Sequence, residues 1–309
     1  MCRPASESRQ RGVTLVELMV ALAIAGALVL AAGTAFLAAR KLADTQADVQ
    51  QVHDTMRYAR YVLQNVVRQA GYVDYTIDVG DGALAAAPAG LADLPVFGAT
   101  RTSVPGTGDS AGVHGSDPVA ANDSLRLRFF GRNLPGGEAV DTTTIDCLGQ
   151  PVSGNARAWS FFYVARAADG EPELYCKRRA VDAGAAERFH AQPIARGVER
   201  FKVVFGHDAD GDSVPERWID AQAIDELARA AGVASTVEWR KVVAVRVGLV
   251  VRGARVHADI PNTAGARDAL MPLGAAFAGE ASFAPPADGR FRASTTFTLM
   301  LRNVIREPA

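Results

Sequence analysis

Four carboxylates lie within one short segment of this chain of 309 residues. Asp208, Asp210 and Asp212 alternate along the sequence, and Glu216 follows them. Alternating carboxylates of this kind converge on one hard cation in calcium loops. Here, however, glycine stands at the fourth position of the loop instead of the sixth, and the twelfth position holds Ile219 instead of glutamate. The pattern of a calcium loop is half met, so calcium binding and a solvated Asp-Gly turn both stay open.

A second motif, GDSAG at residues 108–112, has the G-x-S-x-G spacing of hydrolase nucleophiles, with Ser110 at its centre. That chemistry requires a buried strand before the serine and a helix after it, and the flanking TRTSVPGT and VHGSDP favour neither. The histidines are dispersed, form no metal-binding or catalytic pair, and are expected at the surface or in turns: His53, His114, His190, His207 and His257. These residues therefore predict no enzyme.

Three cysteines are too few for a fold built on disulfides, and the absence of a CxxC pair argues against a structural zinc site. Cys147 and Cys176 lie 29 positions apart on either side of an apolar run, whereas Cys2 is close to the amino terminus. In an oxidising compartment the first two would close a loop and stabilise the fold by about 3–4 kcal/mol. We expect this disulfide, with two free buried thiols as the alternative.

The elements that carry these residues begin with an apolar segment. Residues 1–12 hold three arginines against one glutamate, and residues 13–39 then hold a single charge, Glu17. At about 1.5 Å per residue, the 22 uncharged residues 18–39 span about 33 Å as a helix, enough to cross a bilayer. The run is too long for a cleaved secretory signal, and its basic flank favours a cytoplasmic amino terminus. We therefore predict a single membrane-spanning segment at residues 13–39, with the rest of the chain outside.

Glu17 is costly in this setting, because an acidic side chain near the centre of a bilayer costs about 2.5–3.5 kcal/mol. The segment RGVTLVEL at residues 11–18 resembles the class III signal of type IV prepilins. The resemblance implies cleavage by a prepilin peptidase between Gly12 and Val13, N-methylation of Val13, and a role of Glu17 in assembly. The amine of Val13 in a neighbouring subunit would compensate the buried carboxylate. Val13 departs from the phenylalanine that is usual in that family.

The helix is expected to continue well beyond the membrane. Residues 13–70 contain no proline, and Gly71 is suited to end a helix. From Val49 to Ala70 apolar residues recur three and four positions apart, which is the stripe of an amphipathic helix. We expect this stripe to pack on the chain's own domain in preference to an intermolecular coiled coil.

Strand signals dominate the rest of the chain. Residues 72–121 are rich in glycine and proline and are interpreted as loop. The alternation of Leu125 and Leu127 with Arg126 and Arg128 predicts a sheet with one solvated face. Because strands follow strands, we expect antiparallel pairing in an α+β domain. The predicted strands are residues 124–130, 159–165, 173–178, 198–206, 241–252 and 291–303, and the one predicted helix among them is 221–231.

Several later motifs occur in the order typical of the PilW family of minor pilins: DCLG (146–149), ELYC (173–176), GVE (197–199), FGHDADGD (205–212), VVAVR (242–246) and LRN (301–303). The resemblance implies the type IV pilin fold, in which a long amino-terminal helix packs on an antiparallel sheet. It also implies three parts: a cleaved cytoplasmic leader at 1–12, a helix at 13–71 whose part 13–39 spans the membrane, and an exported domain at 72–309.

The implied function is that of a non-enzymatic minor pilin. Such a subunit sits in the inner membrane with a periplasmic carboxy-terminal domain, then enters a type IV pilus with the major pilin and other minor pilins, supporting priming, twitching motility and adhesion. A minor pseudopilin of a type II secretion system is the nearest alternative, and a membrane-anchored hydrolase or calcium-dependent adhesin belongs to another class. The balance of 33 basic and 34 acidic side chains predicts no nucleic-acid partner.

Overall fold

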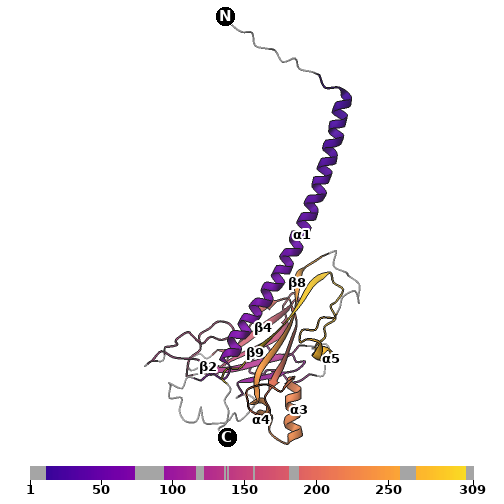
Figure 1. Ribbon diagram of the computed structural model, residues 1–309. Helices are drawn as coiled ribbons and strands as arrows, with labels where there is room; N and C mark the ends of the chain where they lie inside the picture. Colours follow the sequence, from indigo (N-terminus) through magenta and orange to yellow (C-terminus); the bar gives the residue numbers. More distant parts are fainter. Residues whose placement is uncertain are drawn as a thin grey trace. The chain divides into compact units, whose positions relative to one another are not determined.

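The computed structural model describes residues 12–73, 94–115, 122–135, 137, 139–155, 157–180, 188–257 and 269–303. It divides into two compact units, Met1–Asp48 and Val49–Ala309. The helix α1 (Leu15–Gln69) belongs to both and is unbroken along its length, as Figure 1 shows. The prediction of one long helix is therefore confirmed, and nearly all of the irregular and strand structure lies in the second unit.

Gly71 ends α1 for two physical reasons. Its φ of +72° is a backbone conformation that glycine adopts without strain. A Cβ at this position would also lie only 2.4 Å from the carbonyl oxygen of Asn303. The Asn303 amide donates from Nδ2 to the carbonyl oxygens of Arg68 and Ala70, both at 3.2 Å, and so satisfies two groups that the end of a helix leaves open.

Two antiparallel sheets form the second unit. The first has the strand order β1-β2-β3-β4-β5, in which chain neighbours are also sheet neighbours, and the second has the order β7-β6-β8-β9. The strands are β1 (Val96–Ala99), β2 (Ser124–Phe130), β3 (Arg157–Arg166), β4 (Pro172–Ala180), β5 (Arg188–Arg196), β6 (Val198–His207), β7 (Arg217–Ile219), β8 (Val242–Val256) and β9 (Arg290–Met300). The shorter elements are α3 (Ala221–Ala231), α4 (Ser235–Trp239), η2 (Ala275–Phe277) and α5 (Ala278–Ala281).

A single glycine carries the chain from one sheet to the other. Gly197 separates β5 from β6, and its φ is +82°. A Cβ there would lie 2.6 Å from the carbonyl oxygen of Arg252 on β8, so any larger residue would push the two strands apart. The abrupt turn explains how consecutive strands enter different sheets without a loop.

The second half of α1 packs one face against the core of the second unit and leaves its opposite face exposed. Its stripe of small and apolar side chains is buried, as expected for packing on the chain's own domain. Each fully buried Val or Leu stabilises the folded state by about 1.5–3 kcal/mol. The stripe belongs to one continuous cluster with aromatic side chains from both sheets. The helix contributes Val52, Met56, Ala59, Leu63, Val66 and Ala70, and the strands contribute Phe129, Phe161, Phe162, Phe201 and Phe205.

The α+β class and antiparallel pairing are confirmed, but three strands are missing from the sequence prediction. The strand β1 lies inside the segment that was interpreted as loop, and residues 74–93 and 116–121 of that segment lie outside the described residues. The strands β5 and β7 were also missed. All three are sheet edges. Polar residues and Pro193 weaken the apolar pattern of β5, whereas β1 and β7 are runs of only four and three residues.

The prediction of a solvated face on β2 is wrong. Arg126 and Arg128 are only 4% and 8% exposed. The guanidinium of Arg126 lies 4.7 Å from the ring centre of Phe97, and that of Arg128 lies 4.4 Å from that of Trp159. These cations stack on aromatic rings instead of facing water, so simple alternation of apolar and charged residues misled the interpretation.

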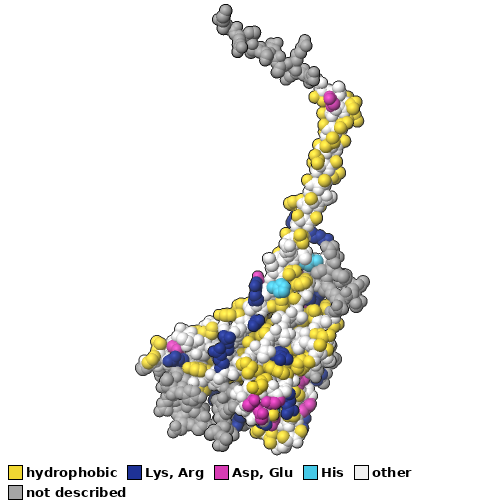
Figure 2. All heavy atoms as spheres, in the orientation of Figure 1, with side chains coloured by type: hydrophobic (Ala, Val, Ile, Leu, Met, Phe, Trp, Pro, Cys, Tyr) yellow, Lys and Arg dark blue, Asp and Glu magenta, His cyan; other side chains and the backbone are white. Residues whose placement is uncertain are grey.

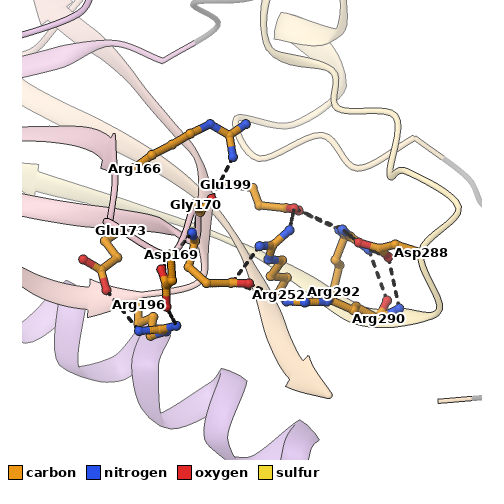
Figure 3. A network of polar contacts seen from close by, with 11 residues as sticks. Arg166, Asp169, Gly170, Glu173, Arg196, Glu199, Arg252, Asp288, Arg290 and Arg292 are labelled. Atoms are coloured by element: carbon orange, nitrogen blue, oxygen red, sulfur yellow. Dashed lines mark hydrogen bonds and ion pairs between the residues drawn. The ribbon is translucent and has the colours of Figure 1, made fainter. Parts of the chain in front are cut away.

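Three carboxylates and three arginines connect the β3–β4 turn to the second sheet (Figure 3). Arg252 bridges two of these carboxylates, with 2.6 Å to Glu171 and 3.0 Å to Glu199. Arg292, which is almost fully buried, lies 2.6 Å from both Glu199 and Asp288. The network is Glu171, Glu199, Asp288, Arg252, Arg290 and Arg292, and it fixes the ends of β6, β8 and β9 next to the turn between β3 and β4.

Candidate processing and assembly site

The predicted cleavage point lies just before α1. Gly12, Val13 and Thr14 are exposed and precede the helix, and no atom of the described residues lies within 4 Å of the position that a Cβ would take on Gly12. Within that part of the chain, nothing covers the peptide bond between Gly12 and Val13. Residues 1–11 of the predicted leader lie outside the described residues.

Glu17 has a partner in the residue that precedes its helix. The backbone N–H and the hydroxyl of Thr14 donate to Oε2 of Glu17, at 2.9 and 3.0 Å, and the backbone N–H of Glu17 donates to Oγ1 of Thr14 at 3.3 Å. This reciprocal arrangement is a capping box, which satisfies N–H groups that the start of a helix leaves open. The sequence analysis singled out Glu17 for its charge and missed Thr14, although the T-x-x-E spacing was the available signal.

The first part of α1 presents apolar side chains on all sides. Every residue from 12 to 44 is exposed, and Figure 2 shows hydrophobic side chains along the visible face of this part of the helix. The described part of the chain contains one helix, α1, that is both long enough and apolar enough to cross a membrane, judged by length and composition. A helix that is apolar all round requires lipid or other helices around it. The exposed large side chains include Val13, Leu15, Val16, Leu18, Met19, Leu22, Ile24, Leu28, Phe36 and Leu37.

The acidic loop after β6 brings its four carboxylates together. One oxygen from each of Asp208, Asp210, Asp212 and Glu216 lies within 4.8 Å of the others. The same carboxylates also organise the loop: Asp208 accepts from the backbone N–H of Gly211 at 2.6 Å, and Asp210 and Asp212 each accept from the N–H two residues further on. The arrangement therefore has both a turn-forming role and the proximity that a cation site needs.

Cys147 and Cys176 form the predicted disulfide, with 6.0 Å between their Cα atoms. Cys176 is on β4, and Cys147 lies in the loop that precedes β3. Both cysteines are buried in the main core cluster, so the bond ties this loop to the sheet.

Two histidines differ from the expectation of surface or turn positions. His207 is 1% exposed, and its Nε2 lies 2.8 Å from Oε2 of Glu238. Burial favours a raised pKa for Glu238, but hydrogen bonds from Lys241 and His207 outweigh it and hold the pKa below its usual value. His114 accepts from the N–H of Thr100 and contacts Asp225 at 2.9 Å. His207 therefore joins β6 to α4, and His114 joins its own loop to α3.

Ser110 is exposed in an irregular segment. Its hydroxyl accepts from the N–H of Gly112 at 3.1 Å, and its carbonyl oxygen accepts from the buried Nζ of Lys177 at 2.8 Å. Within residues 94–115, the structure has no strand leading into this serine and no helix after it, so the surroundings that the hydrolase motif requires are not present there.

Comparisons with known proteins agree with this geometry. Residues 8–33 match the family model described as "Prokaryotic N-terminal methylation motif", and residues 161–303 match the model PilW, "Type IV Pilus-assembly protein W". A solved type IV-like pilin from Thermus thermophilus is similar to the chain with 16% sequence identity and a TM-score of 0.33, covering 61% of this chain and 81% of that one. No curated protein matches the chain.

A methylation motif at the start of a long apolar helix, followed by antiparallel sheets, defines a protein of the type IV pilin class. Within that class, the match over residues 161–303, which include β4 to β9, makes the chain similar to the PilW family of pilus-assembly proteins.

Proposed function

We propose that the chain is a minor pilin that a prepilin peptidase cuts between Gly12 and Val13. Val13 is then N-methylated, and residues 13–39 hold the subunit in the inner membrane with its carboxy-terminal domain in the periplasm. From there it enters a type IV pilus together with other minor pilins and the major pilin. Its role is structural: it supports priming of the pilus, twitching motility and adhesion, and it catalyses no reaction.

The observation that carries this proposal is the exposed Gly12–Val13 bond next to an exposed apolar helix that carries Glu17 in its first turn. In a filament, such a helix buries its apolar side chains against neighbouring helices, and the carboxylate at its start needs a cationic partner. The new amine of Val13 on an adjacent subunit has the required charge and lies at the same end of its helix.

The test separates the charge of Glu17 from its capping role. Glu17→Gln keeps a side chain that completes the capping box but removes the charge, whereas Glu17→Ala removes both. In cells that lack the wild-type copy, we expect both variants to be cut normally and to restore surface pili poorly. Normal pili with Glu17→Gln would show that the charge is dispensable and would overturn the partner assignment.

Gly12→Leu provides the control for processing. We expect this variant to accumulate as the uncut precursor on immunoblots, because a bulky side chain directly before the proposed cut would obstruct the peptidase.

Secretion assays in cells that lack the wild-type copy distinguish a type IV pilus from a type II secretion system. Loss of protein secretion with intact pili would assign the chain to a type II secretion system.

We infer in addition that the acidic loop holds calcium. Four carboxylate oxygens within 4.8 Å of one another repel, and a hard divalent cation relieves that repulsion. Millimolar calcium is expected to raise the melting temperature of the wild-type chain, and Asp210→Ala is expected to abolish the rise, because Asp210 is exposed and its loss leaves the fold intact. An equal response of both proteins, or none in the wild type, would leave the loop as a turn only.

A further inference from the structure

A groove of about 300 Å³ opens in the second unit between α1, the loop 145–149 and the edge strand β5. The helix lines it with Tyr58, Tyr61 and Asn65, and β5 lines it with Gln192 and Pro193. None of these side chains takes part in the processing site, the disulfide or the acidic loop. The volume is at the lower end of the range for small-molecule sites, about 300–1,000 Å³.

The groove offers aromatic faces together with uncommitted polar groups. Tyr58 and Tyr61 are 52% and 62% exposed, and their spacing of three places them on one face of the helix. Neither the amide of Asn65 nor that of Gln192 has a hydrogen-bond partner among the described residues. Each amide supplies both donors and an acceptor, and each phenol supplies one of each.

The lining is also nearly neutral. Asp146 is the one carboxylate among the described residues that line the groove, and its Oδ1 already accepts from the N–H groups of Leu148 and Gln150, at 2.8 and 2.9 Å. Its Oδ2 lies 3.4 Å from Arg178. Among the described residues, no Lys, Arg or His lines the groove, so none of these residues favours an anion.

We propose that this groove binds a neutral saccharide of one or two rings. A sugar ring has an apolar C–H face that stacks on an aromatic side chain, and hydroxyls around its rim that both donate and accept hydrogen bonds. The exposed tyrosines supply the stacking surface, and the amides of Asn65 and Gln192 supply the matching polar groups. This inference goes beyond the role in the pilus, and its failure leaves that role untouched.

Other occupants fit the groove less well. An added β-strand would have to pair with the free edge of β5, but Pro193 in that strand lacks an N–H and interrupts such pairing. An apolar helix would bury both amides without partners, at a cost of about 1–3 kcal/mol for each unsatisfied group. A sugar satisfies these groups and leaves the edge of the strand unpaired.

The experiment uses the full chain in a detergent without a sugar headgroup. Maltose, cellobiose and N,N′-diacetylchitobiose are titrated separately by saturation-transfer NMR, and a soluble Gly-Ser-Ala peptide is titrated as the probe for a protein partner. We expect at least one disaccharide to saturate in the millimolar range. Tyr61→Ala and Gln192→Ala should each weaken its binding about tenfold, whereas Tyr61→Phe should keep most of the affinity because it preserves the stacking ring.

Asn155→Ala is the matched control, because Asn155 is an exposed amide outside the groove, and it should bind like the wild type. The altered side chains are exposed, so unchanged melting temperatures are expected to show that each variant is folded. Failure of all three disaccharides to bind, binding that Tyr61→Ala leaves intact, or saturation by the peptide alone would each overturn the proposal.

Discussion

At the scale of single residues, Asp123 shows how one buried side chain joins the two sheets. It lies just before β2, and its Oδ1 is 2.8 Å from Nζ of Lys202 on β6, with both side chains almost fully buried. The same carboxylate accepts from the backbone N–H groups of Arg101 and Val203, at 3.0 and 2.9 Å. A buried charge of this kind is stable only while all of its partners are present.

We therefore expect Asp123→Ala to lower the free energy of unfolding by about 3–5 kcal/mol, because Lys202 stays buried without its counter-charge. The measurement is urea unfolding of the chain in detergent solution, followed by the fluorescence of its tryptophans. Asp54→Ala is the matched control, since Asp54 and Arg57 form an exposed pair on α1 whose removal costs no more than about 1 kcal/mol. Similar losses in the two variants would contradict this account.

At the scale of elements, the disulfide joins a loop to a strand, and the turn at Gly197 joins one sheet to the other. The Cys147–Cys176 bond fixes the irregular loop before β3 to the central part of β4. Gly197 fixes the order of sheets, because it carries the chain directly from an edge of one sheet into the other.

Removing the disulfide with Cys147→Ser and Cys176→Ser together should lower the free energy of unfolding by about 3–4 kcal/mol, as expected for a closed loop of this length. A reducing agent should destabilise the wild type by a similar amount and leave the double variant unchanged. The comparison requires urea unfolding of both proteins with and without the reductant. If reduction leaves the wild type as stable as before, the bond contributes nothing to folding.

At the scale of the whole molecule, stability depends on arginine–carboxylate pairs that connect distant parts of the chain. Hydrogen bonds from Arg292 lower the pKa of Asp288 to about 2, and the pKa of Glu171 is also held below its usual value by Arg252 and Arg290 against the effect of burial. A carboxyl group with a depressed pKa in the folded state stabilises the fold at pH values above its unfolded pKa. Burial raises the pKa of Asp146, which acts in the opposite direction.

We expect the contribution of Asp288 to be complete above about pH 5 and to disappear as the pH falls through about 4 to 2. Asp288→Asn should therefore be less stable than the wild type at pH 6. The free energies of unfolding of the two proteins, plotted against pH, should converge near pH 2. Urea unfolding over this range provides the measurement. Curves that stay parallel down to pH 2 would show that Asp288 titrates equally in the folded and unfolded chains.

Local rules on the sequence predicted much of this molecule. The helix α1, the strand β2 and the helix α3 follow from residue periodicity and breakers, and the pairing of Cys147 with Cys176 follows from the count and spacing of cysteines. The edge strand β5 was missed because polar residues and Pro193 interrupt its apolar pattern, and β1 and β7 were missed because they are only four and three residues long.

The amino-acid sequence by itself determined the class of the protein, because a charge inside an apolar run, the residues before it and the periodicity of a helix are all local properties. Only the tertiary structure decided that Arg126 and Arg128 face aromatic rings instead of water, that His207 is buried against Glu238, and that two tyrosines of α1 line a groove with β5. These features join residues that are far apart along the chain, and the packing that brings them together depends on all of the elements at once.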